Sequence, residues 1–253
     1  MPMDKMIYSL LSVQRNPEKL HKLLVTMKGI AGADLYELSS DEITAIVSDI
    51  NRASLITDRS TAIEFAGVIE ILSQQFALLP VRFASIMESA DSIIKMLDRN
   101  NHNILQNLHN VENKYEYGLK IFCEPEKLMS ELSLKSEVTS GISATPAPRI
   151  NNSIYREWVN NKLKEHKAEE LLVKYVDSVI AEITLYLGRL NAVSKIKKMT
   201  TATTIIDVAL LLDKTKKEAL VASVEDLQNQ HAALTFVLTG PWPPYNFVEF
   251  TVK

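Results

Sequence analysis

The sequence predicts an α+β fold of two domains. Apolar residues at steps of three and four mark several helices, and shorter alternating or continuous apolar runs mark strands between them. Several of the strand connections favour antiparallel pairing over a doubly wound parallel sheet. Because 253 residues exceed the usual size of one domain, we expect an N-terminal α+β domain over 1–112 and a second domain over 113–253.

The N-terminal domain is expected to begin with a strand over 7–13 and a capped helix. Asn16 is suited to the N-cap, and Pro17 to the first helical position. The turn-like Ser39-Ser40-Asp41 separates two short strand candidates. The elements expected in the rest of this domain are strands at 35–38 and 43–47, helices at 61–77 and 92–110, and an extended segment at 78–83.

The clearest strand signal opens the second domain. Between 115 and 123, apolar residues alternate with a set that includes Glu116 and Lys120, which predicts a sheet covered mainly on one face. The predicted order from there, strand-helix-strand-helix-strand-strand, suggests a ferredoxin-like sheet with a helical insertion. Its expected parts are a short helix at 125–132, a mobile loop at 133–149, a long helical region at 154–190, a central strand at 203–212, a helix at 213–229, and strands at 233–238 and 247–252.

Composition excludes several classes of protein. A net charge of −3 argues against a dedicated nucleic-acid binder. The single cysteine, Cys123, cannot form an internal disulfide or a cysteine-rich metal site, and is expected to be a buried, inert thiol. No signal peptide and no apolar run of transmembrane length is found, so we expect a cytoplasmic protein without a membrane partner.

Patterns for catalysis, metals and cofactors are absent. The sequence contains no phosphate-binding glycine loop and no nucleophile elbow, and His102 and His109 lie too far apart along a helix for the usual metal pair. We therefore predict no catalytic residue, no metal and no cofactor. A basic cluster at 195–198 is either solvated loop charge or a site for an acidic partner.

The C-terminal segment from Gly240 to Phe247 is unusual. Gly240 can take a positive φ, and three prolines stiffen the segment and remove donors, so we expect that it cannot continue a ladder. Aromatic anchors on a stiff segment suit either an internal clasp or a docking element. The candidate residues are Gly240, Pro241, Trp242, Pro243, Pro244, Tyr245 and Phe247.

A second informative segment follows the helix at 61–77. Arg82 stands among apolar residues, so its guanidinium is expected to pair with a carboxylate or with backbone carbonyls. The segment is either a structural anchor or a partner contact. Its candidate residues are Leu79, Pro80, Val81, Arg82 and Phe83.

Together these segments resemble a known family. The ending Leu-Thr-Gly-Pro-Trp-Pro-Pro-Tyr-Asn-Phe-Val at 238–248 resembles the signature of the gas vesicle accessory proteins of the L/F family, and 79–83 resembles that family's other marker. The strand expected at 205–212 also matches, and the resemblance covers essentially the whole chain. Ala84 departs from the family pattern, in which glycine often follows the phenylalanine.

The resemblance implies a non-catalytic accessory protein for the assembly of gas vesicles, the protein shells that give prokaryotes buoyancy. Its implied partners are the small hydrophobic shell protein and other accessory proteins, and its implied location is the gas vesicle and the cytoplasm. We expect the shell protein to bind an apolar patch or a free sheet edge of the N-terminal domain, near its strands and 79–83. Two alternatives stay open: a ferredoxin-like regulatory module that binds a small ligand, and an enzyme of unrecognised type.

Overall fold

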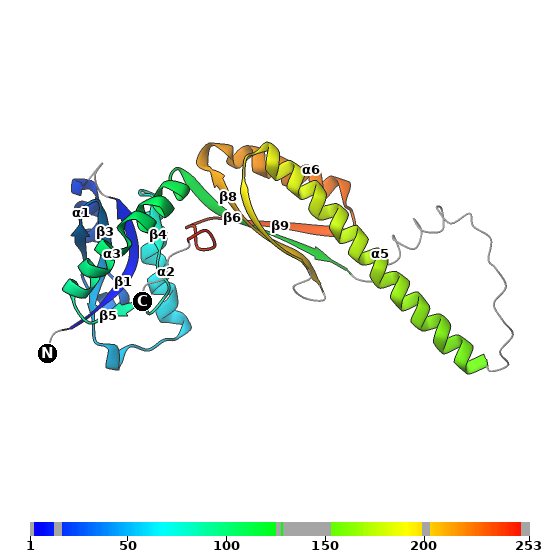
Figure 1. Cartoon of the computed structure of the whole chain (residues 1–253), viewed down its shortest axis with the longest axis horizontal. Coiled ribbons are helices and arrows are strands. Elements are labelled where there is room, and N and C mark those ends of the chain that lie inside the picture. The colour runs from blue at the N-terminus through cyan, green and yellow to red at the C-terminus, as the bar shows by residue number, and fades with distance from the viewer. Residues whose placement is uncertain (1–2, 13–16, 125–127, 129–152, 199–202, 249–253) are drawn as a thin grey trace. The chain divides into compact units, whose positions relative to one another are not determined.

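A computed structural model describes residues 3–12, 17–124, 128, 153–198 and 203–248, with backbone alone at 54 and 153–169. Contacts divide the chain into two compact units (Figure 1). The first unit contains Met1–Tyr117 and Gly240–Lys253, and the second contains Gly118–Thr239. Both units combine helices with antiparallel strands, so the predicted α+β class is confirmed.

The first unit contains a mixed set of helices around one sheet. The order of strands in this sheet is β2-β3-β1-β4, with β5 paired to β1, and each pairing is antiparallel. The elements are β1 (Asp4–Ser12), α1 (Pro17–Thr26), β2 (Leu35–Ser40), β3 (Ile43–Ile50), α2 (Arg59–Ser73), β4 (Leu78–Pro80), β5 (Ile86–Met87) and α3 (Ala90–Val111), with short 3-10 turns η1 (Ile30–Gly32) and η2 (Arg52–Ser54).

The two central strands of this sheet are buried on both faces. Met6 to Leu11 in β1 and Ile43 to Ser48 in β3 are buried without interruption, which requires cover on each side. One core cluster combines strand residues with apolar residues of α1 and α2. The buried residues of α3 lie outside this cluster although α3 contacts all five strands of the sheet, as expected if α3 covers the opposite face.

Tyr8 organises the core beneath α1 and α2. It lies at an irregularity of the β1–β3 register, is completely buried, and its ring stacks on Phe65 with centroids 5.0 Å apart. Its hydroxyl lies 3.0 Å from the Ser48 hydroxyl and accepts a 2.9 Å hydrogen bond from the Ile30 amide. A Cβ at Gly29 would lie 2.4 Å from the same hydroxyl, so this position requires glycine.

Helix starts in the first unit follow the capping rules. Pro17 occupies the first position of α1, as predicted. Asp58 accepts a 2.9 Å hydrogen bond from the Thr61 amide and starts α2 at residue 59, and Ser89 caps α3 in the same way. Both helices therefore begin two residues before the predicted positions. The prediction used the apolar pattern alone, and the capping residues lie outside that pattern.

The second unit is a four-stranded sheet with two long helices. Its elements are β6 (Lys114–Cys123, of which 114–117 group with the first unit), α5 (Ser153–Arg189), β7 (Val193–Lys198), β8 (Thr204–Asp213), η3 (Lys214–Lys216), α6 (Lys217–Gln230) and β9 (Leu234–Trp242, of which 240–242 group with the first unit). The strand order is β7-β8-β6-β9. Figure 1 shows α5 and α6 side by side along this sheet, and the helix residues Val176, Val179, Ile183, Leu187, Leu220 and Leu227 are buried. The apolar strand β8 is central, as predicted.

Two predictions for the second unit are wrong. Residues 195–198 belong to the edge strand β7, whose register pairs Lys197 with Asp207 of β8. Lysines suit an edge because they discourage pairing with other chains. The strand β9 continues through Gly240 and Pro241 to Trp242, although the prolines were expected to end the ladder. Pro241 is tolerated because β9 is also an edge strand, where one side needs no donors.

Among the described residues, the order of elements in the second unit is strand-helix-strand-strand-helix-strand, which corrects the predicted order. The predicted domain boundaries remain a prediction, but by contacts the segment from Gly240 groups with the first unit rather than with 118–239. The predicted helix at 125–132 (apart from Leu128), the loop at 133–149 and most of the strand at 247–252 lie outside the described residues.

Candidate functional site

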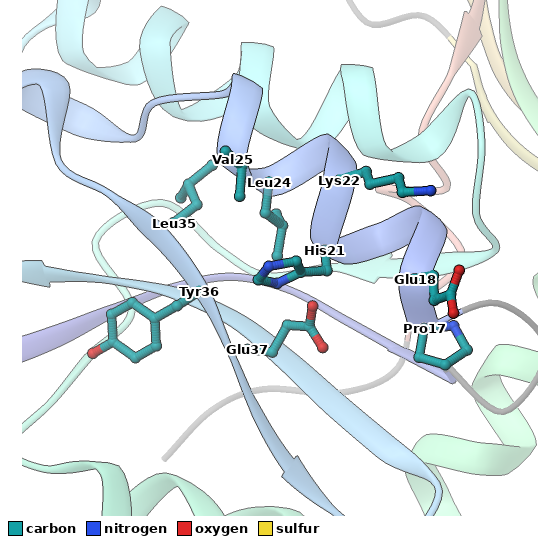
Figure 2. Close-up of a pocket in the computed structure, with 9 residues that line it drawn as sticks. All are labelled: Pro17, Glu18, His21, Lys22, Leu24, Val25, Leu35, Tyr36 and Glu37. Carbon is teal, nitrogen blue, oxygen red and sulfur yellow. The ribbon is translucent and has the colours of Figure 1, made fainter.

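A groove between α1 and β2 is the candidate site of the first unit. It encloses a cavity of about 590 Å³. Figure 2 shows side chains of the helix and of the strand facing each other across it. The groove is lined by Pro17, Glu18, His21, Lys22, Leu24, Val25, Leu35, Tyr36 and Glu37.

The amphipathic pattern of α1 builds one wall of the groove. Leu20 and Leu24 point into the core, whereas Val25 is 70% exposed. The opposite wall is β2, which is an edge of its sheet because only β3 pairs with it among the described strands. An apolar surface beside an unpaired strand edge is therefore open to solvent here.

Charged groups lie along the same groove. Burial raises the pKa of the half-buried Glu37 carboxyl, and nearby His21 opposes this shift. Among the described residues, no hydrogen bond or ion pair is found for the Glu37 side chain. The neighbouring Tyr36, in contrast, donates a 2.7 Å hydrogen bond to Asp49, which also pairs with Lys5. Hydrogen bonds from Lys5 and then from Tyr36 lower the pKa of Asp49.

The predicted segment 79–83 lies at the other side of the first sheet. Leu79 of β4 is completely buried, Pro80 is buried, and Val81 donates a 3.0 Å hydrogen bond to the Tyr8 carbonyl. The Phe83 ring packs edge-on against Phe65 with centroids 5.3 Å apart. These contacts favour a structural anchor.

Arg82 behaves differently from its neighbours. Its side chain is exposed, and among the described residues no carboxylate or carbonyl pairs with it, so the expected pairing is not found. It lines a second cavity of about 600 Å³ together with Arg52 and Glu88. The chain turns directly after it: the Ser85 amide donates to the Arg82 carbonyl at 3.1 Å, with Ala84 at a φ of 64°.

The C-terminal segment packs within the first unit. Pro243, Pro244 and Phe247 are buried. Gly240 has the predicted positive φ, 112°, and a Cβ there would lie 2.9 Å from the Glu116 carbonyl. Trp242 is 42% exposed, so part of the motif also faces solvent.

Glu116 holds this segment, a role that the local sequence pattern does not predict. Only 5% of it is exposed, and its carboxylate accepts hydrogen bonds of 2.7 and 2.6 Å from the backbone amide and the side-chain amide of Asn246. Desolvation raises the pKa of neighbouring Tyr245 to about 12, with smaller contributions from Glu70 and Glu116. The alternating pattern placed Glu116 on the solvent face, and its partner lies 130 residues away.

Metal ligands, thiols and helices of membrane-spanning length are further features of the described parts of the chain that bear on function. There, no group of three or more histidine, cysteine or acidic residues is arranged to hold a metal ion. Cys123 is buried, and desolvation raises the pKa of its thiol. No helix in the described ranges combines the length and apolarity of a bilayer-spanning segment.

Comparison with known proteins identifies the family. The family model described as gas vesicle synthesis protein GvpL/GvpF matches residues 6–249. The chain belongs to the GvpL/GvpF family. Gas vesicle protein F1 of Halobacterium salinarum is 23% identical over 91% of this chain and 89% of its own, and gas vesicle protein L of Haloferax mediterranei is 21% identical over 87% and 72%.

Solved structures of similar proteins share the fold. The crystal structure of GvpF from Anabaena sp. covers 98% of this chain and 97% of its own at 17% identity, with a TM-score of 0.74. That of GvpF from Microcystis aeruginosa covers 98% and 100% at 15% identity, with a TM-score of 0.71. Family membership supports an accessory role in gas vesicles for this chain.

Proposed function

We propose that this chain is a non-catalytic accessory protein of gas vesicle assembly that binds the small hydrophobic shell protein and other accessory proteins. Family membership supports the gas vesicle role. A shell subunit with a large apolar surface aggregates if left free, so an accessory protein that covers this surface before assembly would keep the subunit available.

The groove between α1 and β2 is the observation that carries the binding proposal. It combines the two features that such a partner needs, an exposed apolar side chain at Val25 and an outer edge of β2 to which no described strand pairs. It belongs to the first unit, on the N-terminal domain as expected, but it lies at the sheet edge opposite residues 79–83, near which binding was expected. We therefore place the shell-protein site at this groove.

The two family motifs take supporting roles in this proposal. The buried part of 79–83 anchors β4 against β1. The C-terminal motif clasps the first unit through Glu116. The exposed side chains of Arg82 and Trp242 are proposed as secondary contacts for other accessory proteins.

The proposal also includes a domain organisation for this chain. We infer an N-terminal α+β domain and a ferredoxin-like domain formed by the second sheet with α5 and α6. The strand order β7-β8-β6-β9 and the order of elements from β6 to β9 support the ferredoxin-like assignment.

Co-expression of this chain with the shell protein of its host, followed by affinity capture, tests the proposal. Val25→Lys places a charge on the apolar wall near the end of α1, where a cation is compatible with the helix dipole. Ile56→Lys is the matched control, because Ile56 lies outside the groove and is 69% exposed, against 70% for Val25. We expect Val25→Lys to abolish retention and Ile56→Lys to keep it. If the unchanged chain retains no shell protein, the proposed function is wrong.

A further inference from the structure

The shape of the groove defines the kind of segment that fits it. On one side lies β2, six residues long, whose only strand partner among the described residues is β3. On the other side lies α1, with the exposed Val25 and the largely buried Leu24 lining the gap (Figure 2). A helix running beside a free strand edge is the arrangement in which other domains accept an extended peptide as an additional strand.

Backbone groups of β2 supply the affinity in such a mode. Every second residue of an antiparallel edge strand leaves both its N–H and its C=O without a strand partner, and an added strand satisfies these groups in register. The alternating side chains of the added strand then point either toward the wall formed by Leu24, Val25 and Leu35 or away from it. This favours an occupant that is extended and apolar at every second position.

Glu37 adds a charge requirement. It stands in the middle of β2, it is half-buried, and no cation of the described chain pairs with it. Figure 2 shows the imidazole of His21 beside the Glu37 carboxylate, where it acts on the charge of that group, but among the described residues no ion pair joins the two. A half-buried carboxylate without a partner is costly, and a basic side chain brought by the occupant removes this cost.

We propose that an extended, mainly apolar segment of the shell protein adds to the free edge of β2 beneath α1 and places one lysine or arginine against Glu37. This proposal rests on the proposed function and specifies its binding mode. A second copy of this chain is the less favoured occupant. Pairing of β2 with itself about a twofold axis brings two Glu37 carboxylates close together, and like charges across strands are destabilising.

Hydrogen exchange of the full chain, alone and co-purified with the shell protein, tests the strand addition. We expect the outward-facing amides within 35–40, which are every second residue, to exchange at least about tenfold more slowly in the complex, since an added strand supplies acceptors for them. Retention of the shell protein without protection of 35–40 overturns strand addition but leaves the proposed function standing. No retention at all is instead the failure of the proposed function.

Charge substitutions test the role of Glu37. Glu37→Gln keeps the shape of the side chain and removes its charge. Binding is measured with an overlapping set of shell-protein peptides. We expect the peptides that contain a lysine or arginine to bind this variant about tenfold more weakly. Glu37→Lys should abolish this binding, and a peptide whose basic residue is replaced by glutamate should restore it. Glu225→Lys on the exposed face of α6 is the control and should bind normally. If Glu37→Gln binds the peptides as well as the unchanged chain does and also self-associates, the proposal is overturned. Glu37 would then serve to prevent β2 from pairing with a second copy of the chain.

Discussion

Removal of the Glu116 carboxylate is predicted to release the C-terminal segment from the first unit. The carboxylate is nearly fully buried and accepts two short hydrogen bonds from Asn246. A hydrogen bond to a charged group contributes about 1.5–3 kcal/mol to stability. Glu116→Ala loses both bonds and leaves their donors without these acceptors, so we expect a loss of about 3 kcal/mol. Glu116→Gln keeps one acceptor, and we expect a loss of about 1.5 kcal/mol.

Trp242 is a convenient reporter of this change, because it lies in the same segment as Asn246. A Trp158→Phe background leaves Trp242 as the single tryptophan, since the chain has two. Urea unfolding followed by its fluorescence should show the midpoint for Glu116→Ala lowered by about 1.5 M, taking a slope of about 2 kcal/mol per M.

A reciprocal exchange isolates the interaction itself. Asn246→Asp alone places two carboxylates together and should destabilise the first unit by about 2 kcal/mol or more. Combined with Glu116→Gln, the new side-chain amide can donate to the new carboxylate, so the double variant should recover part of the loss. If the effects of the two substitutions simply add, the hydrogen bonds of Asn246 to Glu116 are not what holds the segment.

Three further predictions concern the first unit. Ala84→Gly should stabilise the protein by about 0.5–1 kcal/mol in thermal unfolding, because the φ of 64° is strained for alanine and suits glycine. Gly29→Ala should destabilise it by about 1–3 kcal/mol, because the new methyl group collides with the Tyr8 hydroxyl. Lys5 lowers the pKa of Asp49 below its ordinary value of 3.8, so this carboxylate contributes stability above that pH, which is lost as the pH falls through the lower folded value.

Each of these predictions has a matched control. Ala222→Gly, on the exposed face of α6, should cost about 1 kcal/mol, opposite in sign to Ala84→Gly. Gly67→Ala meets no atom within 4 Å in helix α2 and should be neutral or stabilising, unlike Gly29→Ala. Asp49→Asn should make the free energy of unfolding fall less steeply as the pH drops below 3.8. An unchanged fall would show that other carboxylates cause the loss of stability in acid.

Local periodicity predicted the elements that bury a regular face. The helices α1 and α3, the alternating strand β6 and the apolar strand β8 were all found near their expected positions. The strand β7 was missed because Lys195 and its neighbours make an edge strand polar, and an edge has little apolar surface to bury.

Local periodicity does not predict contacts between distant parts of the chain. Nothing near Glu116 in the sequence indicates that Asn246 returns to cover it. The groove likewise depends on the edge position of β2, which follows from the strand order and not from its own residues. Ala84 was noted as a departure from the family pattern, and only its positive φ gives that departure a physical meaning.

Photo-crosslinking in cells that assemble gas vesicles tests the central claim, that the groove of the first unit binds the shell protein. A photoreactive residue is placed at position 25, on the wall of the groove, and in a second strain at position 56, which is equally exposed but lies outside it. We predict a crosslink to the shell protein from position 25 and none from position 56. A crosslink from position 56 alone would contradict the proposed site and show that the shell protein binds another face of the first unit.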